Sequence, residues 1–139
     1  MSDLKNKSDA MSAIESLIVS FSNHDKEAYF SYFADDATFL FHNQGRLLHS
    51  KAEYKSEWTK WEDEDEFRVL ECASSHKNLQ LLGDTAIFTH WVTTKIGTVA
   101  GNETSHERET IVMKLNDSGQ WLAVHEHLSV ASSSVVNFT

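Results

Sequence analysis

The sequence predicts an α+β fold, in which three N-terminal helices pack on a strongly curved, mostly antiparallel sheet. Apolar residues recur at helical spacing in the first part of the chain, and alternating strand patterns separated by turn signals fill the part after Phe67. Helices first and an antiparallel meander second are typical of an α+β domain. The run from Arg108 to Ser129 reads as two strands joined by a tight turn. Together these features predict a small cone with an internal pocket.

The first two predicted helices lie before residue 37. Ser8 or Asp9 can cap the first helix, because both side chains accept hydrogen bonds from free backbone N–H groups. Its buried stripe is formed by Met11, Ile14, Leu17, Ile18 and Phe21. Asp25 caps the second helix. One face of this helix carries Ala28, Tyr29, Tyr32 and Phe33. We interpret Asp35 and Asp36 as the turn that leads into a strand.

The third predicted helix opens on a capping box. Ser50 takes the cap position and Glu53 follows at the position whose side chain can reach back to the cap. Tyr54, Trp58 and Trp61 then recur at i, i+4 and i+7, which places them on one face. The carboxylates at 62–66 are consecutive, whereas a hard-cation loop needs spaced ligands and a turn glycine. We therefore interpret them as a solvated helix end.

Turn residues bound the predicted strands. A strand at 37–42, a turn at Asn43-Gln-Gly45 and a short return strand at 47–48 lie between the second and third helices. Long strands fill the rest of the chain, and their turns contain Gly83, Gly97 and Gly119. These strands are predicted at 67–82, 85–96, 103–115 and 120–130.

Length, charge and cysteine content set the class of protein. The 139 residues predict one domain at 8–130, with flexible tails at 1–7 and 131–139. The net charge of −9 disfavours nucleic acid and anionic membrane surfaces as partners. No apolar run approaches the ~18 residues of a membrane span. Cys72 is the single cysteine, so no intrachain disulfide can form, which fits a reducing compartment. We expect a cytoplasmic protein.

No cofactor is expected. The chain has no Gly-rich phosphate loop, no Gly-x-Ser-x-Gly elbow and no Cys-x-x-Cys pair. His125 and His127 share a strand face, but the acidic residue that follows such a pair in His-x-His metal sites is missing. We therefore expect no metal.

The last strands carry carboxylates on their more apolar faces. The face of the final strand that is expected to pack on the helices carries Leu122, Val124, Glu126, Leu128 and Val130. The opposite face carries Trp121, Ala123, His125, His127 and Ser129. In the preceding strand, Glu107 and Glu109 extend the face of Ile111, Met113 and Leu115. His90 lies between Phe88 and Val92. Because a carboxylate on an apolar face is costly unless paired or hydrated, Glu109 and Glu126 mark a cavity or a buried pair.

Two alternatives stay open for these carboxylates. They can form structural ion pairs with Arg108, Arg68 or Lys95. A one-residue bulge would instead exchange the two faces of the last strands. In that case the pocket lining would consist of Arg108, Thr110, His125 and His127.

From about Ser8 to Val130 the chain resembles the NTF2-like superfamily, and within it SnoaL-like and ketosteroid-isomerase-like proteins. The most specific stretch runs from Arg108-Glu-Thr through Gly119-Gln-Trp121 to His125-Glu-His127-Leu-Ser129. That ending is also similar to the association domain of calcium/calmodulin-dependent protein kinase II. The resemblance implies three helices against a strongly bent mixed sheet, a pocket between them and, commonly, a homodimer. The Tyr, protonated Asp and Asp base of ketosteroid isomerase have no evident match here.

The resemblance does not select a function, because this fold serves isomerases, dehydratases, ligand binders and assembly domains. The favoured hypothesis is binding of a small amphipathic or aromatic molecule. The residues expected to line its site are Tyr29, His42, Tyr54, Trp58, Trp61 and Phe88. A second hypothesis is a cofactor-independent isomerase, dehydratase or hydrolase, with Glu126, Glu109 and His90 as general acid and base. A third is an assembly domain whose dimer interface contains Trp121, His125 and His127.

Overall fold

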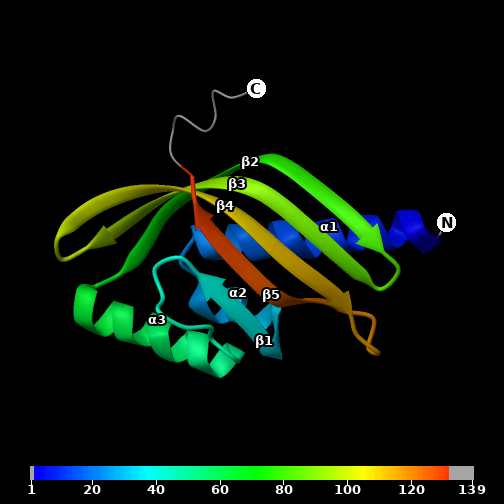
Figure 1. Cartoon of the computed structure of the whole chain (residues 1–139), viewed down its shortest axis with the longest axis horizontal. Helices are drawn as coiled ribbons and strands as arrows, with labels where there is room; N and C mark the ends of the chain where they lie inside the picture. Colours follow the sequence, from blue (N-terminus) through cyan, green and yellow to red (C-terminus); the bar gives the residue numbers. More distant parts are fainter. Residues whose placement is uncertain (1, 132–139) are drawn as a thin grey trace.

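The computed structural model describes residues 2–131 and places three helices against a curved sheet (Figure 1). The elements in chain order are α1 (Ser2–Ser22), α2 (Lys26–Ser31), β1 (Phe33–Phe41), α3 (Lys51–Asp65), β2 (Arg68–Leu82), β3 (Thr85–Thr98), β4 (Gly101–Leu115) and β5 (Trp121–Val130). The strand order across the sheet is β1-β5-β4-β3-β2. β1 runs parallel to β5, and the other neighbours are antiparallel. The predicted α+β fold with a mixed, mostly antiparallel sheet is therefore confirmed.

Helix α1 begins earlier than the apolar pattern predicts. It starts at Ser2, so residues 2–7, which were predicted as a tail, belong to the helix. This first segment is polar. Lys5 and Asp9 lie one turn apart on the helix, and their ion pair of 2.6 Å stabilises it. Of the tail predicted at 131–139, residues 132–139 lie outside the described residues. Ala131, at its edge, is buried and donates its N–H to the carbonyl of His106.

The predicted caps of α2 and α3 are confirmed. Asp25 accepts a hydrogen bond from the N–H of Ala28, and Ser50 accepts one of 3.1 Å from the N–H of Glu53. Helix α3 ends at Asp65, and the following cap residue Glu66 adopts a left-handed conformation with φ of 53°. None of the helices between residues 2 and 131 is long and apolar enough to cross a membrane.

Strand β1 also begins earlier than predicted, at Phe33 rather than Ala37. Asp35 and Asp36 lie within this strand, where its register against β5 shifts, and they do not form a turn. The predicted return strand near Leu48 reduces to one antiparallel bridge with Phe39.

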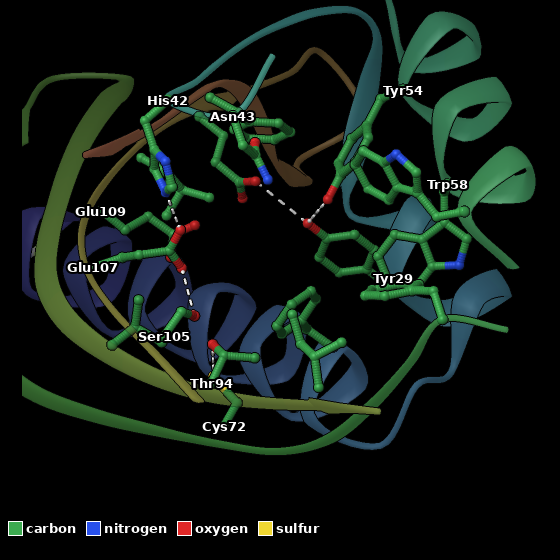
Figure 2. A pocket seen from close by; sticks show the side chains of 18 of the residues that line it. Tyr29, His42, Asn43, Tyr54, Trp58, Cys72, Thr94, Ser105, Glu107 and Glu109 are labelled. Carbon is green, nitrogen blue, oxygen red and sulfur yellow. Dashed lines mark hydrogen bonds and ion pairs between the residues drawn. The ribbon is translucent and has the colours of Figure 1, made fainter. Parts of the chain in front are cut away.

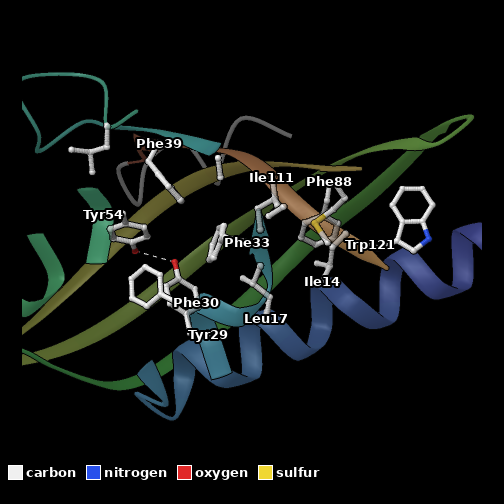
Figure 3. Close-up of a cluster of buried hydrophobic side chains, with 14 of the residues drawn as sticks. Ile14, Leu17, Tyr29, Phe30, Phe33, Phe39, Tyr54, Phe88, Ile111 and Trp121 are labelled. Carbon is white, nitrogen blue, oxygen red and sulfur yellow. Dashed lines mark hydrogen bonds between the residues drawn. The ribbon is translucent and has the colours of Figure 1, made fainter. Parts of the chain in front are cut away.

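Packed aromatic rings between α2, α3 and β1 form one half of the core (Figure 3). Tyr54 is the hub, with its ring centre 4.5 Å from that of Phe39 and 5.0 Å from that of Phe30. The other half lies between α1 and the sheet. It contains Ile14, Ala86, Phe88, Ile111, Met113 and Trp121.

A bulge in β5 decides which of its residues face the core. Val112 pairs with His125 and Met113 pairs with Ala123, so Val124 has no partner on β4. Trp121 and Ala123 are buried before the bulge, and Glu126 is buried after it.

The prediction of a regular alternation along β5 is therefore wrong for the residues before the bulge. Trp121 was expected on the outer face as a dimer contact, but it is 5% exposed within the hydrophobic core of the single chain. His127 is exposed as expected, and His125 is half-buried with its Nδ1 2.7 Å from the hydroxyl of Thr38. The alternative in which Thr110, His125 and His127 line the pocket does not occur, because after the bulge Glu126 faces inward.

Candidate functional site

A cavity of about 430 Å³ lies between the helices and the sheet, with walls contributed by all three helices and every strand. Aromatic side chains line one side and carboxyl groups the other, as the positions of Tyr54, Trp58, Glu107 and Glu109 show (Figure 2). The aromatic wall consists of Phe21, Tyr29, Tyr54, Trp58, Trp61 and Phe67. The acidic residues of the lining are Asp65, Glu103, Glu107, Glu109 and Glu126.

Two groups of polar contacts lie at the cavity, one around Tyr29 and one around His90. Tyr29 and Tyr54 share a hydrogen bond of 2.9 Å between their hydroxyls. Tyr29 also donates to Oε1 of Glu126 at 3.3 Å. On the sheet, Nε2 of His90 lies 2.5 Å from Oε1 of Glu109. The Nδ1 of the same imidazole lies 2.5 Å from the hydroxyl of Ser74 on β2, which is not part of the lining.

Glu109 and Glu126 supply one carboxyl to each group, Glu126 buried and Glu109 largely so, and they form a carboxyl pair. The two side chains lie close enough for each carboxyl to shift the pKa of the other. Burial raises the pKa of Glu109 to about 8, and the charge of Glu107 acts in the same direction. Burial, and then the charge of Glu109, raise the pKa of Glu126 well above its usual range. The pair therefore keeps protons at neutral pH that exposed carboxyls have lost.

The neighbours of this pair are held in their neutral forms. Burial lowers the pKa of His90 to about 4, with a smaller contribution from the charge of Lys77. Although His90 and Glu109 have the geometry of an ion pair, both shifts favour the uncharged forms, so this contact is a neutral hydrogen bond at neutral pH. Burial likewise raises the pKa values of Tyr29 and Tyr54 well above the usual range. The phenols therefore remain donors.

A second polar pair also lines the cavity. Nε2 of His42 lies 2.5 Å from Oε2 of Glu107, and the hydroxyl of Ser105 lies 3.5 Å from Oε1. Cys72 lines the β2 side, and burial raises the pKa of its thiol to about 11. The thiol is therefore a poor nucleophile at neutral pH.

Most of the residues predicted for the site lie together around this cavity. The three candidate catalytic residues and five of the predicted lining residues belong to it, namely Glu126, Glu109, His90, Tyr29, His42, Tyr54, Trp58 and Trp61. Phe88 does not, because it faces the core at the start of β3, where its ring packs 4.8 Å from that of His90. The alternative ion pairs with Arg68, Lys95 and Arg108 are not found for Glu109 or Glu126 in the described part of the chain.

Several lining residues were missed as site residues. Glu107 and Ser105 could have been found, because they alternate with Glu109 on one face of the same strand. Thr94 could have been found in the same way, because it alternates with His90 on one face of β3. Asn43 reads as an ordinary turn residue, and no pattern in the sequence marks it as part of the lining.

Comparisons with known proteins agree with this architecture. A family profile described as "SnoaL-like domain" matches residues 10–133. A comparison with curated proteins gave no match. An NTF2-like protein of unknown function in nutrient uptake from Rhodospirillum rubrum is similar in structure, with a TM-score of 0.76 and 18% identity over 89% of this chain and 99% of that one.

Two further solved structures are similar over most of their length. A ketosteroid isomerase-like protein from Erwinia carotovora atroseptica has a TM-score of 0.75 and 14% identity, over 91% of this chain and 96% of that one. A putative calcium/calmodulin dependent protein kinase II association domain from Xanthomonas campestris has a TM-score of 0.70 and 16% identity, over 86% of this chain and 84% of that one. At these identities the likeness shows the fold alone. The profile match over most of the chain shows the family, and the protein is a member of the SnoaL-like family with an NTF2-like fold.

Proposed function

We propose that this protein binds a small amphipathic molecule in the cavity between its helices and its sheet. The observation that carries the proposal is the division of the cavity: its aromatic wall can hold an apolar body, and its carboxyl wall can orient one polar group. The volume of about 430 Å³ lies in the range of small-molecule sites.

Filling the cavity tests this proposal. Thr94 and Thr93 are neighbours on β3, but Thr94 is buried in the lining whereas Thr93 lies outside it. Thr94→Phe should therefore abolish the fluorescence increase of the neutral apolar probe Nile red, and the matched control Thr93→Phe should keep it. Equal probe binding by wild type and both variants would mean that the probe binds elsewhere, and it would refute the proposal.

A second candidate function is proton transfer to and from the bound molecule. It is favoured by the contact between Glu109 and Glu126, because in such a pair one carboxyl can accept a proton while the other donates one. With a ketone in the cavity, the ionised carboxyl would take a proton from the carbon next to the carbonyl. The electron pair of that C–H bond would move to the carbonyl oxygen as the enolate forms. The protonated carboxyl or Tyr29 would donate a hydrogen bond to this oxygen.

Exchange in heavy water tests this second candidate without knowledge of the substrate. Neutral apolar ketones would be incubated with the protein in D₂O, and loss of the α-proton signal would be followed by NMR. Exchange should rise with pH up to about 8, since the pKa of Glu109 is about 8, and it should be lost in Glu109→Gln. Exchange that is the same with Glu109→Gln as with wild type would exclude the carboxyl pair as the catalyst and leave the binding proposal intact.

A further inference from the structure

We infer that the ligand of this cavity is an organic amine bound as a cation, with a positively charged nitrogen on an apolar or aromatic body. The inference rests on the proposed binding function and names the chemical class of the ligand. Three properties of the cavity carry it: the sign of the charges in its lining, the lack of a basic partner for its most buried carboxyl, and the π-faces opposite.

The ionisable lining is acidic. Glu103, Glu107 and Glu109 of β4 and Glu126 of β5 belong to the lining, whereas no Lys or Arg among residues 2–131 does. The imidazoles present are His42, which contacts Glu107, and His90, which contacts Glu109. A carboxylate or phosphate would find no Lys or Arg partner among these groups, whereas a cation would find carboxyls that can ionise beside it.

The deepest carboxyl has no cationic partner. Glu126 is 2% exposed, lines the cavity, and receives its hydrogen bond from the hydroxyl of Tyr29 at 3.3 Å. No ion pair of Glu126 with Lys, Arg or His is found among residues 2–131. A buried carboxyl of this kind is stabilised when a cation enters beside it. An ammonium group would supply that charge together with N–H donors for the pair of Glu126 and Glu109.

The wall opposite the carboxyls suits the rest of such a ligand. Tyr54 and Trp58 are buried with their rings in the lining, and Trp61 and Phe67 extend the same wall. Aromatic faces attract a cation and bury its apolar substituents. A bare metal ion would not use this wall. In the part of the chain that the structure describes, no three His, Cys, Asp or Glu side chains form a group that could hold a metal.

Proton release gives the inference a second readout. A cation next to Glu109 and Glu126 favours their charged forms, so protons that burial retains on the pair at neutral pH should leave when the cation binds. The titratable and charged groups around the pair come from every packed element. They are Tyr29 on α2, Tyr54 on α3, Cys72 on β2, His90 on β3 and Glu107 on β4, and the charge of Lys77 on β2 acts on His90.

A matched ligand series tests the class. 4-Phenylbutylamine, 4-phenylbutanol and 4-phenylbutyrate share one body and carry an ammonium, a hydroxyl and a carboxylate. Titration calorimetry at pH 7 should give the amine at least about tenfold tighter binding than the alcohol, and the carboxylate should bind more weakly than both. Repeating the titration in buffers with different heats of ionisation should show proton release with the amine and none with the alcohol.

Variants assign the preference to the carboxyl pair. Glu126→Gln should remove the preference for the amine while binding of the alcohol persists, which also shows that the variant is folded. Glu71→Gln removes the same charge from an exposed position outside the lining and should leave the preference unchanged. If the alcohol binds wild type as tightly as the amine, the inference is overturned and the binding function stands. If the amine, the alcohol and Nile red all fail to bind, the proposed function fails and the inference falls with it.

Discussion

Raising the pH from 6.5 to 8.5 should destabilise this protein, because its buried carboxyl pair must then ionise. The pKa of Glu109 is about 8 in the folded protein against 4.5 for an ordinary Glu. Between these values the folded state binds more protons than the unfolded state. Stability therefore falls with rising pH, by at most about 1.4 kcal/mol per pH unit for one such group.

His90 acts with the opposite sign and sets the pH window. Its pKa is about 4 when folded against 6.5 for an ordinary His, so the unfolded state binds more protons between these values and stability rises with pH there. From about pH 4.5 to 6.5 the effects of Glu109 and His90 nearly cancel. Above pH 6.5 the effect of Glu109 dominates. The two groups together predict a net loss of about 1.5 kcal/mol between pH 6.5 and 8.5, and the raised pKa of Glu126 adds to this loss.

Urea unfolding followed by tryptophan fluorescence measures this effect. Wild type should show a free energy of unfolding that declines from pH 6.5 to 8.5. Glu109→Gln should lose most of the decline, whereas the exposed control Glu71→Gln should keep it. A free energy of unfolding for wild type that stays constant or rises from pH 6.5 to 8.5 would refute the reasoning. So would a decline in Glu109→Gln equal to that of wild type.

Two further predictions concern the core and the thiol. Trp121→Ala should lower the free energy of unfolding by about 3–5 kcal/mol, because it empties a core position rather than trimming an outer face; a loss below about 1 kcal/mol in urea unfolding would contradict this placement. The thiol of Cys72 should react with a disulfide reagent much more slowly than free cysteine at pH 8, because its pKa is about 11. Absorbance of the released thiolate measures the rate, and a rate equal to that of free cysteine would show that this side of the cavity opens to solvent.

The fold could be predicted from local signals that the tertiary structure preserves. Asp25 and Ser50 cap helices as their sequence context predicts, and alternation places Glu107 and Glu109 on the inner face of β4. The sequence does not predict the early start of α1, because helices are predicted from a periodic apolar stripe and the first turns of α1 carry none.

The site was predicted where alternation is regular and missed where it is interrupted. Glu126 and His90 follow from period-two patterns, whereas Trp121 changes face because β5 holds an extra residue at Val124. Neither the composition nor the spacing of β5 marks that bulge, since it arises from the pairing with β4. Asn43 reaches the cavity through the path of a loop, which a single sequence does not encode in a readable pattern.

The bulge at Val124 divides β5 between two separate tasks. Trp121 and Ala123 belong to the packed interior, and Glu126 and Leu128 belong to the lining of the cavity. Under the proposed binding function, a change of ligand would call for substitutions after Val124 and not at the core positions Trp121 and Ala123. One strand thus supplies a constant part of the scaffold and a part whose substitution would alter the cavity.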